Sequence, residues 1–284
     1  MNIDALKMFV TIVQEGSISK AAQEMGYAQS NISTKVHNLE LVLKTQLFYR
    51  TARGVTLTKA GELLYGQAIK IIKLNSETIN KLQHPQSVVG SLKIGTLQTA
   101  ASTFLPQILS NYHQSIPDVE LSIQTGTTLV NTKRILDYQL DGAIIGGRID
   151  EKNLISIPIM TEKLCLITAK NMPLDIEKDS LLVFPVGCAY RKALESWLDS
   201  KQTMIHHPIE FNYLNAIIAS VSAGLGISVL PERVAQPYLD TNVIQKIDLP
   251  KDFSSLPVSF IYRQDYVINP AFTEFIKEIK RFFN

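Results

Sequence analysis

Polar side chains near the amino terminus have the residue types that bind base edges and phosphates of duplex DNA. They are Gln29, Ser30, Ser33, Thr34 and Lys35. Glutamine pairs bidentately with adenine, hydroxyl groups bond bases or phosphates, and lysine reaches guanine or phosphate. The same residues would also suit an ordinary solvated helix face, so the surrounding elements must decide between the two interpretations.

The elements around this polar run predict a helix-turn-helix. Helical spacing of apolar residues indicates a first helix that ends near Glu15, followed by a cap at Gly16-Ser17, a short second helix with small residues and a turn at Gly26. A third helix then carries the polar residues. Its predicted buried stripe is Ile32, Val36, Leu39 and Leu43.

The segment that follows the third helix has the pattern of a wing. Short β-prone pieces between residues 47 and 58 flank a glycine turn, with Arg50, Thr51 and Arg53 beside it. Wings contact phosphates or the minor groove. For Arg50, a salt bridge or cap within the wing is an equally good explanation.

The residues from 9 to 61 resemble the LysR-type transcriptional regulators. The resemblance rests on Phe9-Val10, Gly16-Ser17, Ala21-Ala22, Gln29-Ser30, Ser33, Leu39-Glu40, Leu47-Phe48, Arg50, Leu57-Thr58 and Ala60-Gly61. The sequence departs from the family at Lys44, where glycine is usual, and at Ser30, where proline is common. The resemblance implies that Gln29, Ser30, Thr34 and Lys35 face the major groove, that Ser33 and Thr51 bond phosphates, and that Arg53 enters the minor groove.

A proline-free stretch from Lys59 to Gln83 predicts one long amphipathic helix. Its apolar stripe is Leu64, Ala68, Ile71, Ile72, Ile79 and Leu82. This stripe could pack on its own chain or on the same helix of a second chain. The resemblance assigns a dimerising linker helix to this place, and it further implies a dimer of dimers, a homotetramer, on interrupted palindromes.

The remainder alternates predicted strands and helices, which indicates parallel-sheet lobes. The predicted strands are 91–95, 119–124, 142–145, 164–169, 181–184, 227–230 and 258–262, and the predicted helices are 106–113, 129–139, 190–198, 215–223 and 270–282. Crossings between two lobes are expected near Pro158–Thr161 and Phe260–Arg263. Gly95, Leu105-Pro106, Pro117, Asp141 and the run 224–231 are similar to the effector domain of the LysR-type family, itself like periplasmic solute-binding proteins.

Hydroxyl and amide side chains follow the first two strands of this body, where a cleft between lobes would open. They are Gln98, Thr99 and Ser102, then Thr125, Thr127 and Thr128, with Thr128 expected to cap the next helix. Helix N-termini there would favour a small anionic effector. Simple helix capping explains any one of these residues equally well.

A second group is expected on the other lobe. Cys188, Tyr190 and Arg191 lie at the start of a predicted helix, whose dipole and nearby cation would lower a thiol pKa. Asn212 and Tyr213 are further candidates for the cleft wall. Redox sensing through Cys188 is an alternative, although the partner cysteine of peroxide-sensing relatives is absent, and an enzyme using Cys188 is a weaker one. A packed, inert Cys188 is also possible.

Composition sets outer limits on these interpretations. Residues 1–87 hold 10 Lys and Arg against 6 Asp and Glu, and the remainder holds 18 against 20, so the amino-terminal part is the basic one. Two cysteines, no metal-ligand spacing, no export signal and no membrane-length apolar run predict a cytoplasmic protein without a cofactor or metal. A solute-binding transport component would need an export signal and no DNA-binding head.

We therefore predict an α/β protein with an all-α winged helix-turn-helix head, a long linker helix and a two-lobed α/β effector domain. The expected boundaries are 1–58, 59–87 and 88–284, with one lobe at about 88–160 plus 262–284 and the other at about 161–261. The expected partners are double-stranded promoter DNA, a small effector and further copies of the chain. The expected function is effector-controlled, sequence-specific regulation of transcription without catalysis.

Overall fold

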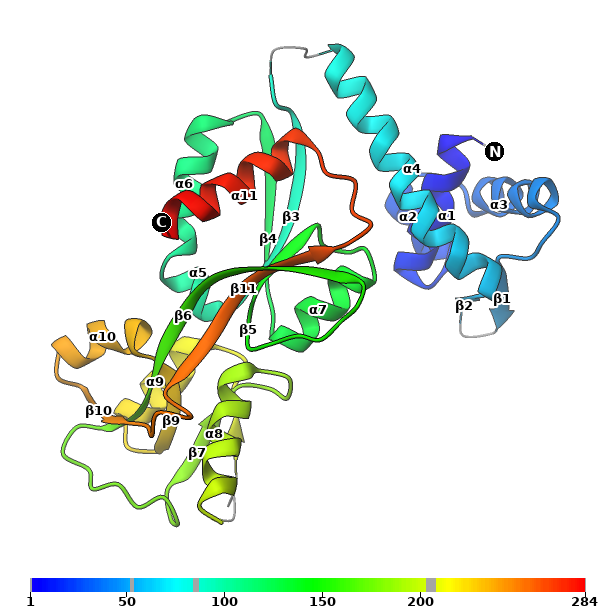
Figure 1. The fold of residues 1–284 in the computed structure, drawn as a ribbon. Helices are drawn as coiled ribbons and strands as arrows, with labels where there is room; N and C mark the ends of the chain where they lie inside the picture. The colour runs from blue at the N-terminus through cyan, green and yellow to red at the C-terminus, as the bar shows by residue number, and fades with distance from the viewer. Residues whose placement is uncertain (1, 52–53, 84–86, 203–207, 284) are drawn as a thin grey trace. The chain divides into compact units, whose positions relative to one another are not determined.

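The structure, a computed structural model, describes residues 2–51, 54–83, 87–202 and 208–283. The chain forms two compact units, Met1–Ser87 and Val88–Asn284 (Figure 1). Each unit has its own hydrophobic core.

The first unit is a helix-turn-helix with a two-stranded wing and a long last helix. Its elements are α1 (Ile3–Glu15), α2 (Ile18–Met25), α3 (Gln29–Leu43), β1 (Phe48–Thr51), β2 (Gly54–Leu57) and α4 (Lys59–Gln83). Asn2 and Ser17 begin the first two helices, since their side-chain oxygens accept from the N–H groups of Ala5 and Lys20. The end of the first helix, the turn and the long helix are confirmed.

The buried stripe of α3 is confirmed at three of its four predicted positions. Ile32, Val36 and Leu39 are buried against α1 and α2, whereas Leu43 is exposed. Leu43 is the last residue of α3, and the chain turns away at Lys44, whose φ of 52° is left-handed. Glycine adopts this conformation without strain, which explains why glycine is the usual residue at this position.

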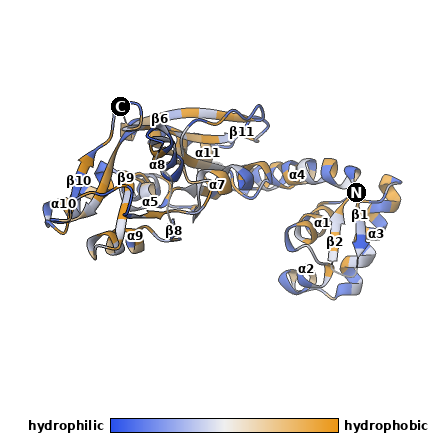
Figure 2. Ribbon diagram, turned by 90° about the horizontal axis from the view of Figure 1, so that it is seen from below, coloured by the Kyte–Doolittle hydropathy of each residue, from blue (hydrophilic) through white to orange (hydrophobic). Residues whose placement is uncertain are grey.

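The apolar face of α4 is divided between the head and the surface. Ala68 is buried, and Leu64, Ile71 and Ile72 pack against the core of the first unit. Leu63, Leu74, Ile79 and Leu82 are exposed. Figure 2 accordingly shows hydrophobic and hydrophilic bands mixed along the whole helix. The first half of the expected stripe thus packs on its own unit, whereas Ile79 and Leu82 in its second half are exposed.

The second unit is built on one mixed sheet. Its strands are β3 (Gly90–Thr96), β4 (Val119–Thr125), β5 (Gly142–Gly146), β6 (Leu154–Ala169), β7 (Ser180–Val183), β8 (Ile209–Glu210), β9 (Gly226–Pro231), β10 (Ile244–Asp248) and β11 (Ser255–Arg263). Among the described residues the strand order is β4-β3-β5-β11-β6-β9-β7-β8, with β10 on β6. The helices are α5 (Gln98–Ser102), α6 (Leu105–Ser115), α7 (Thr128–Leu136), α8 (Ala189–Ser200), α9 (Leu214–Ser222), α10 (Glu232–Asp240) and α11 (Pro270–Phe283).

Two long strands, β6 and β11, run side by side and join the two halves of this sheet (Figure 1). β6 pairs with β11 along Leu154–Lys163 and with β9 from Leu164 onward, so the chain passes into the second lobe there. β11 pairs with β5 over Val258–Ile261. The expected return crossing at Phe260–Arg263 is therefore placed too late, because the strand has already rejoined the first lobe at Val258.

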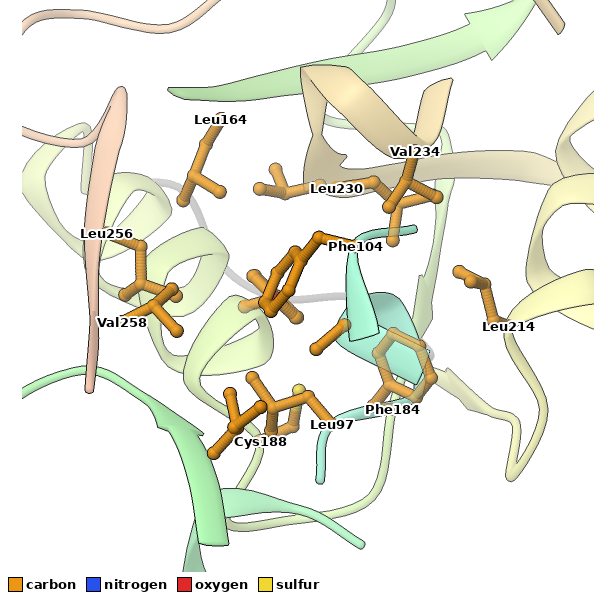
Figure 3. Close-up of a cluster of buried hydrophobic side chains, with 14 of the residues drawn as sticks. Leu97, Phe104, Leu164, Phe184, Cys188, Leu214, Leu230, Val234, Leu256 and Val258 are labelled. Atoms are coloured by element: carbon orange, nitrogen blue, oxygen red, sulfur yellow. The ribbon is translucent and has the colours of Figure 1, made fainter. Parts of the chain in front are cut away.

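A continuous apolar core extends through both lobes. Figure 3 shows Phe104 of the first lobe surrounded by Leu164, Leu230 and Val234 of the second, with Leu97 and Cys188 nearby. Phe104 is 2% exposed. The lobes are thus packed together by buried apolar side chains, which favours a closed arrangement.

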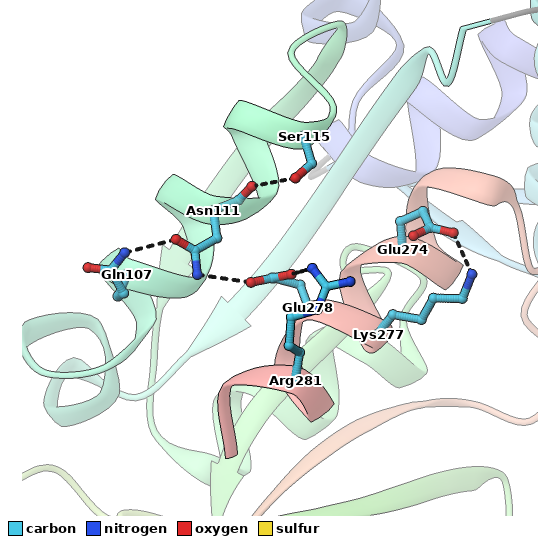
Figure 4. A network of polar contacts seen from close by, with 7 residues as sticks. All are labelled: Gln107, Asn111, Ser115, Glu274, Lys277, Glu278 and Arg281. Carbon is cyan, nitrogen blue, oxygen red and sulfur yellow. Dashed lines mark hydrogen bonds and ion pairs between the residues drawn. The ribbon is translucent and has the colours of Figure 1, made fainter. Parts of the chain in front are cut away.

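Polar contacts fix the helices on the outer face of the first lobe (Figure 4). Asn111 of α6 donates to buried Glu278 of α11 at 3.0 Å, and Arg281 donates to the same carboxylate at 2.8 Å. The Asn111 contact holds the carboxy-terminal helix against α6.

Several predicted elements need correction. Thr127, not Thr128, caps α7, since its Oγ1 accepts from the N–H of Val130, and the helix ends at Leu136 rather than at 139. The first half of β6 and the elements α10, β10 and β8 were not predicted from the sequence.

Candidate DNA-binding face and inter-lobe cavity

The exposed side of α3 carries the polar residues singled out in the sequence. Gln29, Ser30, Thr34 and Lys35 are exposed and Ser33 is half-buried. They project from a helix whose opposite side is fixed by Ile32, Val36 and Leu39 in the core. The Gln29 amide oxygen accepts from the Ser19 hydroxyl at 3.0 Å, so α2 orients the first residue of this face.

The wing residues differ in the contacts that they already make within the protein. The Arg50 guanidinium lies 3.9 Å from Glu40, a carboxylate that also accepts from the N–H of Leu47 at 2.8 Å. Arg50 remains about half exposed, so the pair leaves it accessible. Thr51 donates to the carbonyl of Gly54 at 3.2 Å. Arg53 lies outside the described residues.

Sequence reasoning missed a groove between α3 and β1. A hollow of about 600 Å³ is lined by Ser33, Thr34, His37, Glu40, Gln46, Phe48, Tyr49 and Arg50. Tyr49 is 59% exposed although it is aromatic. The alternation of β1 could have flagged it, because buried Phe48 forces its neighbour to the outside.

In the second unit, side chains from both lobes enclose a cavity of about 480 Å³. Predicted residues on its wall are Gln98, Thr99, Thr127, Cys188, Tyr190, Asn212 and Tyr213, together with Thr125. Its apolar wall, which was not predicted, is Leu97, Val130, Phe184, Pro185 and Val186. Among the described residues, no charged side chain lines it. The structure thus brings most of the expected cleft residues together.

Hydrogen bonds between the lobes lie at this cavity and next to it. The Gln98 side chain donates to the carbonyl of Asn212 and accepts from the N–H of Leu214 at 2.8 Å. Next to the cavity, where a second hollow of about 800 Å³ begins, the N–H of Leu129 donates to the carbonyl of Gly187 at 3.3 Å. A side chain at Gly187, whose φ is 90°, would collide with Leu129, so this close approach requires glycine.

A buried chain of polar groups crosses the floor. Thr99 Oγ1 lies 2.7 Å from the Tyr190 hydroxyl, which lies 2.7 Å from Oε2 of Glu162 on β6. Burial raises the pKa of Glu162, and this effect exceeds the lowering of the pKa by the hydrogen bond from Tyr190 and by the charge of Arg233. Burial likewise raises the pKa of Tyr190. Glu162 was not predicted as a site residue. The signal that could have found it is a carboxylate in a strand-forming run, next to the expected crossing between the lobes.

Three expected effector residues lie elsewhere. Thr128 hydrogen-bonds the backbone of Gly146 and faces a second, more open hollow of about 800 Å³. Arg191 lines that hollow too, and it is bound to Glu195 at 2.7 Å and Glu210 at 2.8 Å. Ser102 is exposed and donates to the carbonyl of Thr99. These contacts already occupy the groups that were expected to meet an anion.

The expected activation of Cys188 is wrong in direction. Burial raises the pKa of its thiol despite lowering by the N–H groups of Arg191 and Tyr190. The side chain is 5% exposed and belongs to the apolar core (Figure 3). Cys165 is also a buried free thiol, and burial raises its pKa to about 11. Neither cysteine has the exposed, electropositive setting of a reactive thiol.

Comparisons with known proteins agree with this two-part architecture. Residues 3–62 match the family model described as bacterial regulatory helix-turn-helix protein, lysR family, and residues 85–284 match the LysR substrate binding domain. The chain belongs to the LysR family. This LysR-family chain is 36% identical to the HTH-type transcriptional regulator GltR of Bacillus subtilis (strain 168), over 100% of its own length and 97% of GltR.

Solved structures show that the LysR-family fold extends over the whole chain. Full-length OxyR C199D from Pseudomonas aeruginosa superposes with a TM-score of 0.74 at 23% identity, covering 100% of this chain and 94% of OxyR. Full-length CbnR in complex with its target DNA gives 0.65 at 20% identity, covering 99% and 100%. Within the residues that the structure describes, no helix is long and apolar enough to cross a membrane, and no cluster of three His, Cys, Asp or Glu side chains could hold a metal ion.

Proposed function

We propose that this chain regulates transcription by binding promoter DNA in a sequence-specific manner through α3 and the wing. The observation that carries the proposal is the polar, exposed face of α3. Gln29, Ser30, Thr34 and Lys35 supply base-edge donors and acceptors, and Ser33, Arg50, Thr51 and Arg53 supply phosphate or minor-groove contacts. A solved CbnR structure holds its target DNA, which supports the same use of this fold here.

The proposal assigns control to a small effector in the 480 Å³ cavity between the lobes. Gln98, Thr99, Thr127, Tyr190, Asn212 and Tyr213 offer polar groups on a mainly apolar wall, which is the usual composition of a ligand pocket. No cationic side chain lines the described wall, so the charge of an anionic effector would be met by hydroxyls and by the N-terminus of α7. The proposal includes no catalysed reaction.

We further assign dimerisation to the face of α4 that does not pack on the head. Leu63 and Leu74 are 70% and 57% exposed and lie about three helical turns apart on one face. Two copies of this face would bury those leucines against each other and present two copies of α3 to one DNA duplex. A tetramer would be two such dimers, and a cytoplasmic location follows from the DNA partner.

The direct test measures mass and DNA binding of the full chain. We expect a dimer or tetramer in light scattering, and we expect genomic fragments selected by the purified protein to share an interrupted palindrome. A monomer that binds every fragment equally at fixed salt would contradict the proposal.

A further inference from the structure

The three polar groups at the cavity floor come from three separate elements. Thr99 belongs to α5 of the first lobe, Tyr190 to α8 of the second lobe, and Glu162 to β6, the strand that joins the lobes. The two oxygen–oxygen distances, Thr99 to Tyr190 and Tyr190 to Glu162, are both 2.7 Å. Thr99 and Tyr190 also line the cavity, so the chain leads from the proposed ligand position to a buried carboxyl group.

All three residues are withdrawn from solvent. Thr99, Tyr190 and Glu162 are 1%, 2% and 3% exposed. Such short contacts between buried oxygens require one proton in each, because two lone pairs facing each other without water would repel. The position of every proton in the chain is therefore linked to the state of its neighbour.

The elements around Glu162 present few groups that could share its proton. From α10, Arg233 favours the ionised form through its charge. From α8, Tyr190 is the hydrogen-bond partner, and Cys188 lies close enough to affect Tyr190. On β11, apolar Leu256 is the residue paired with Glu162.

The charge of Glu162 fixes the direction of the chain. An ionised carboxylate can only accept, so Tyr190 donates to it and Thr99 must donate to Tyr190. Thr99 then offers the cavity only lone pairs. A protonated Glu162 can donate to Tyr190, which lets Tyr190 donate to Thr99 and leaves the Thr99 hydroxyl free to donate into the cavity.

We propose that the protonation state of Glu162 determines which ligand groups the cavity accepts, because it sets whether Thr99 offers a hydrogen-bond donor or only an acceptor. A carboxylate that binds at Thr99 therefore brings one proton onto Glu162. This proposal rests on the assignment of the cavity as the effector site. The proton comes from solvent and stays on Glu162 while the carboxylate is bound. A ligand that presents an N–H or O–H donor to Thr99 binds without this uptake.

The test uses benzoate, with benzamide as its uncharged counterpart, on the full chain. Binding is measured by calorimetry between about pH 5 and 8, where benzoate stays ionised. Benzoate affinity of the unmodified protein should fall with rising pH by up to about tenfold per pH unit, the limit for one linked proton. Two buffers of different ionisation enthalpy should report uptake of one proton, and benzamide should show neither effect.

Glu162→Gln is the decisive variant, because its amide can donate to Tyr190 at every pH. Its benzoate affinity should be independent of pH and match that of the unmodified protein at low pH. Glu120→Gln, at an exposed position on β4, is the matched control and should retain the slope. Equal slopes in the unmodified protein and Glu162→Gln would overturn the proposal.

A measurement without ligand separates failure of this proposal from failure of the cavity as a site. The carboxyl carbon of Glu162, followed by 13C NMR, should titrate at a different pH in Thr99→Val, since the hydrogen-bond chain has lost its last member. If benzoate binds at no pH, this titration decides: a shifted midpoint supports the coupling from Glu162 to Thr99, and an unchanged midpoint overturns it.

Discussion

The Oε1 atom of Gln98 in the first lobe accepts a hydrogen bond from the N–H of Leu214 in the second, at 2.8 Å. The amide nitrogen of the same side chain donates to the carbonyl of Asn212. One half-buried glutamine thus binds a carbonyl group and an N–H group of the backbone that leads into α9. Because these bonds join the two lobes, they oppose opening of the cavity.

Replacing Gln98 by alanine should loosen this side of the cavity. The change removes two hydrogen bonds and should lower the free energy of unfolding of the second unit by about 1–2 kcal/mol. Amide exchange at Leu214 should accelerate, because its acceptor is gone. Gln107→Ala is the control, since Gln107 is exposed and bonds only its half-buried helix neighbour Asn111 in the contacts that the structure describes. Unchanged exchange at Leu214 would show that Gln98 does not hold the lobes.

Lys35→Ala should weaken operator binding without affecting folding. Lys35 is exposed on α3, so its loss removes no core packing and, by the proposed assignment, one DNA contact. The slope of log affinity against log salt should fall by about 1 if Lys35 binds phosphate. Lys7→Ala, exposed on α1, is the charge-matched control. Overlapping salt curves for the two variants would remove Lys35 from the interface.

Thr99→Val and Thr128→Val should have different effects, although both threonines were predicted to bind the effector. Thr99 lines the 480 Å³ cavity, so its valine variant should lose the effector response while still binding DNA. Thr128 instead bonds Gly146, and its variant should lose about 1 kcal/mol of stability and keep the response. Effector dose–response curves and thermal unfolding of both variants check this pair, and a normal response in Thr99→Val would contradict the site.

Cys188 should be unreactive in the folded protein. Its thiol is buried and has a raised pKa, so little nucleophilic thiolate exists near neutral pH. Iodoacetamide should label Cys188 only after unfolding, and Cys188→Ser should leave any peroxide response unchanged. Rapid labelling of the native chain, detected by mass spectrometry, would revive the redox alternative.

The sequence predicted elements well where local patterns decide them. Gly16-Ser17 and the helical spacing before them are local signals, and α1 ends and α2 begins there. The sequence could not show that Arg191 would be bound by Glu210, because Glu210 comes from a strand that was not predicted. Thr128 was assigned to the cleft because the sequence does not show that the backbone of Gly146, at the end of β5, would bind its hydroxyl. The role of Glu162 likewise depends on two residues from other elements.

Glu162→Gln should change how stability depends on pH. Burial raises the folded-state pKa of Glu162 above its ordinary value, so the folded protein binds this proton more tightly than the unfolded chain does. The stability linked to this proton is complete below the ordinary pKa of about 4.3 and is lost as pH rises through the raised folded value. Glu162→Gln has no such group, so its free energy of unfolding should rise relative to the unmodified protein between about pH 4 and 8. Urea unfolding of both proteins across that range measures the difference between their free energies of unfolding, with Glu120→Gln as control. A constant or falling difference would show that ionisation of Glu162 does not destabilise the folded protein.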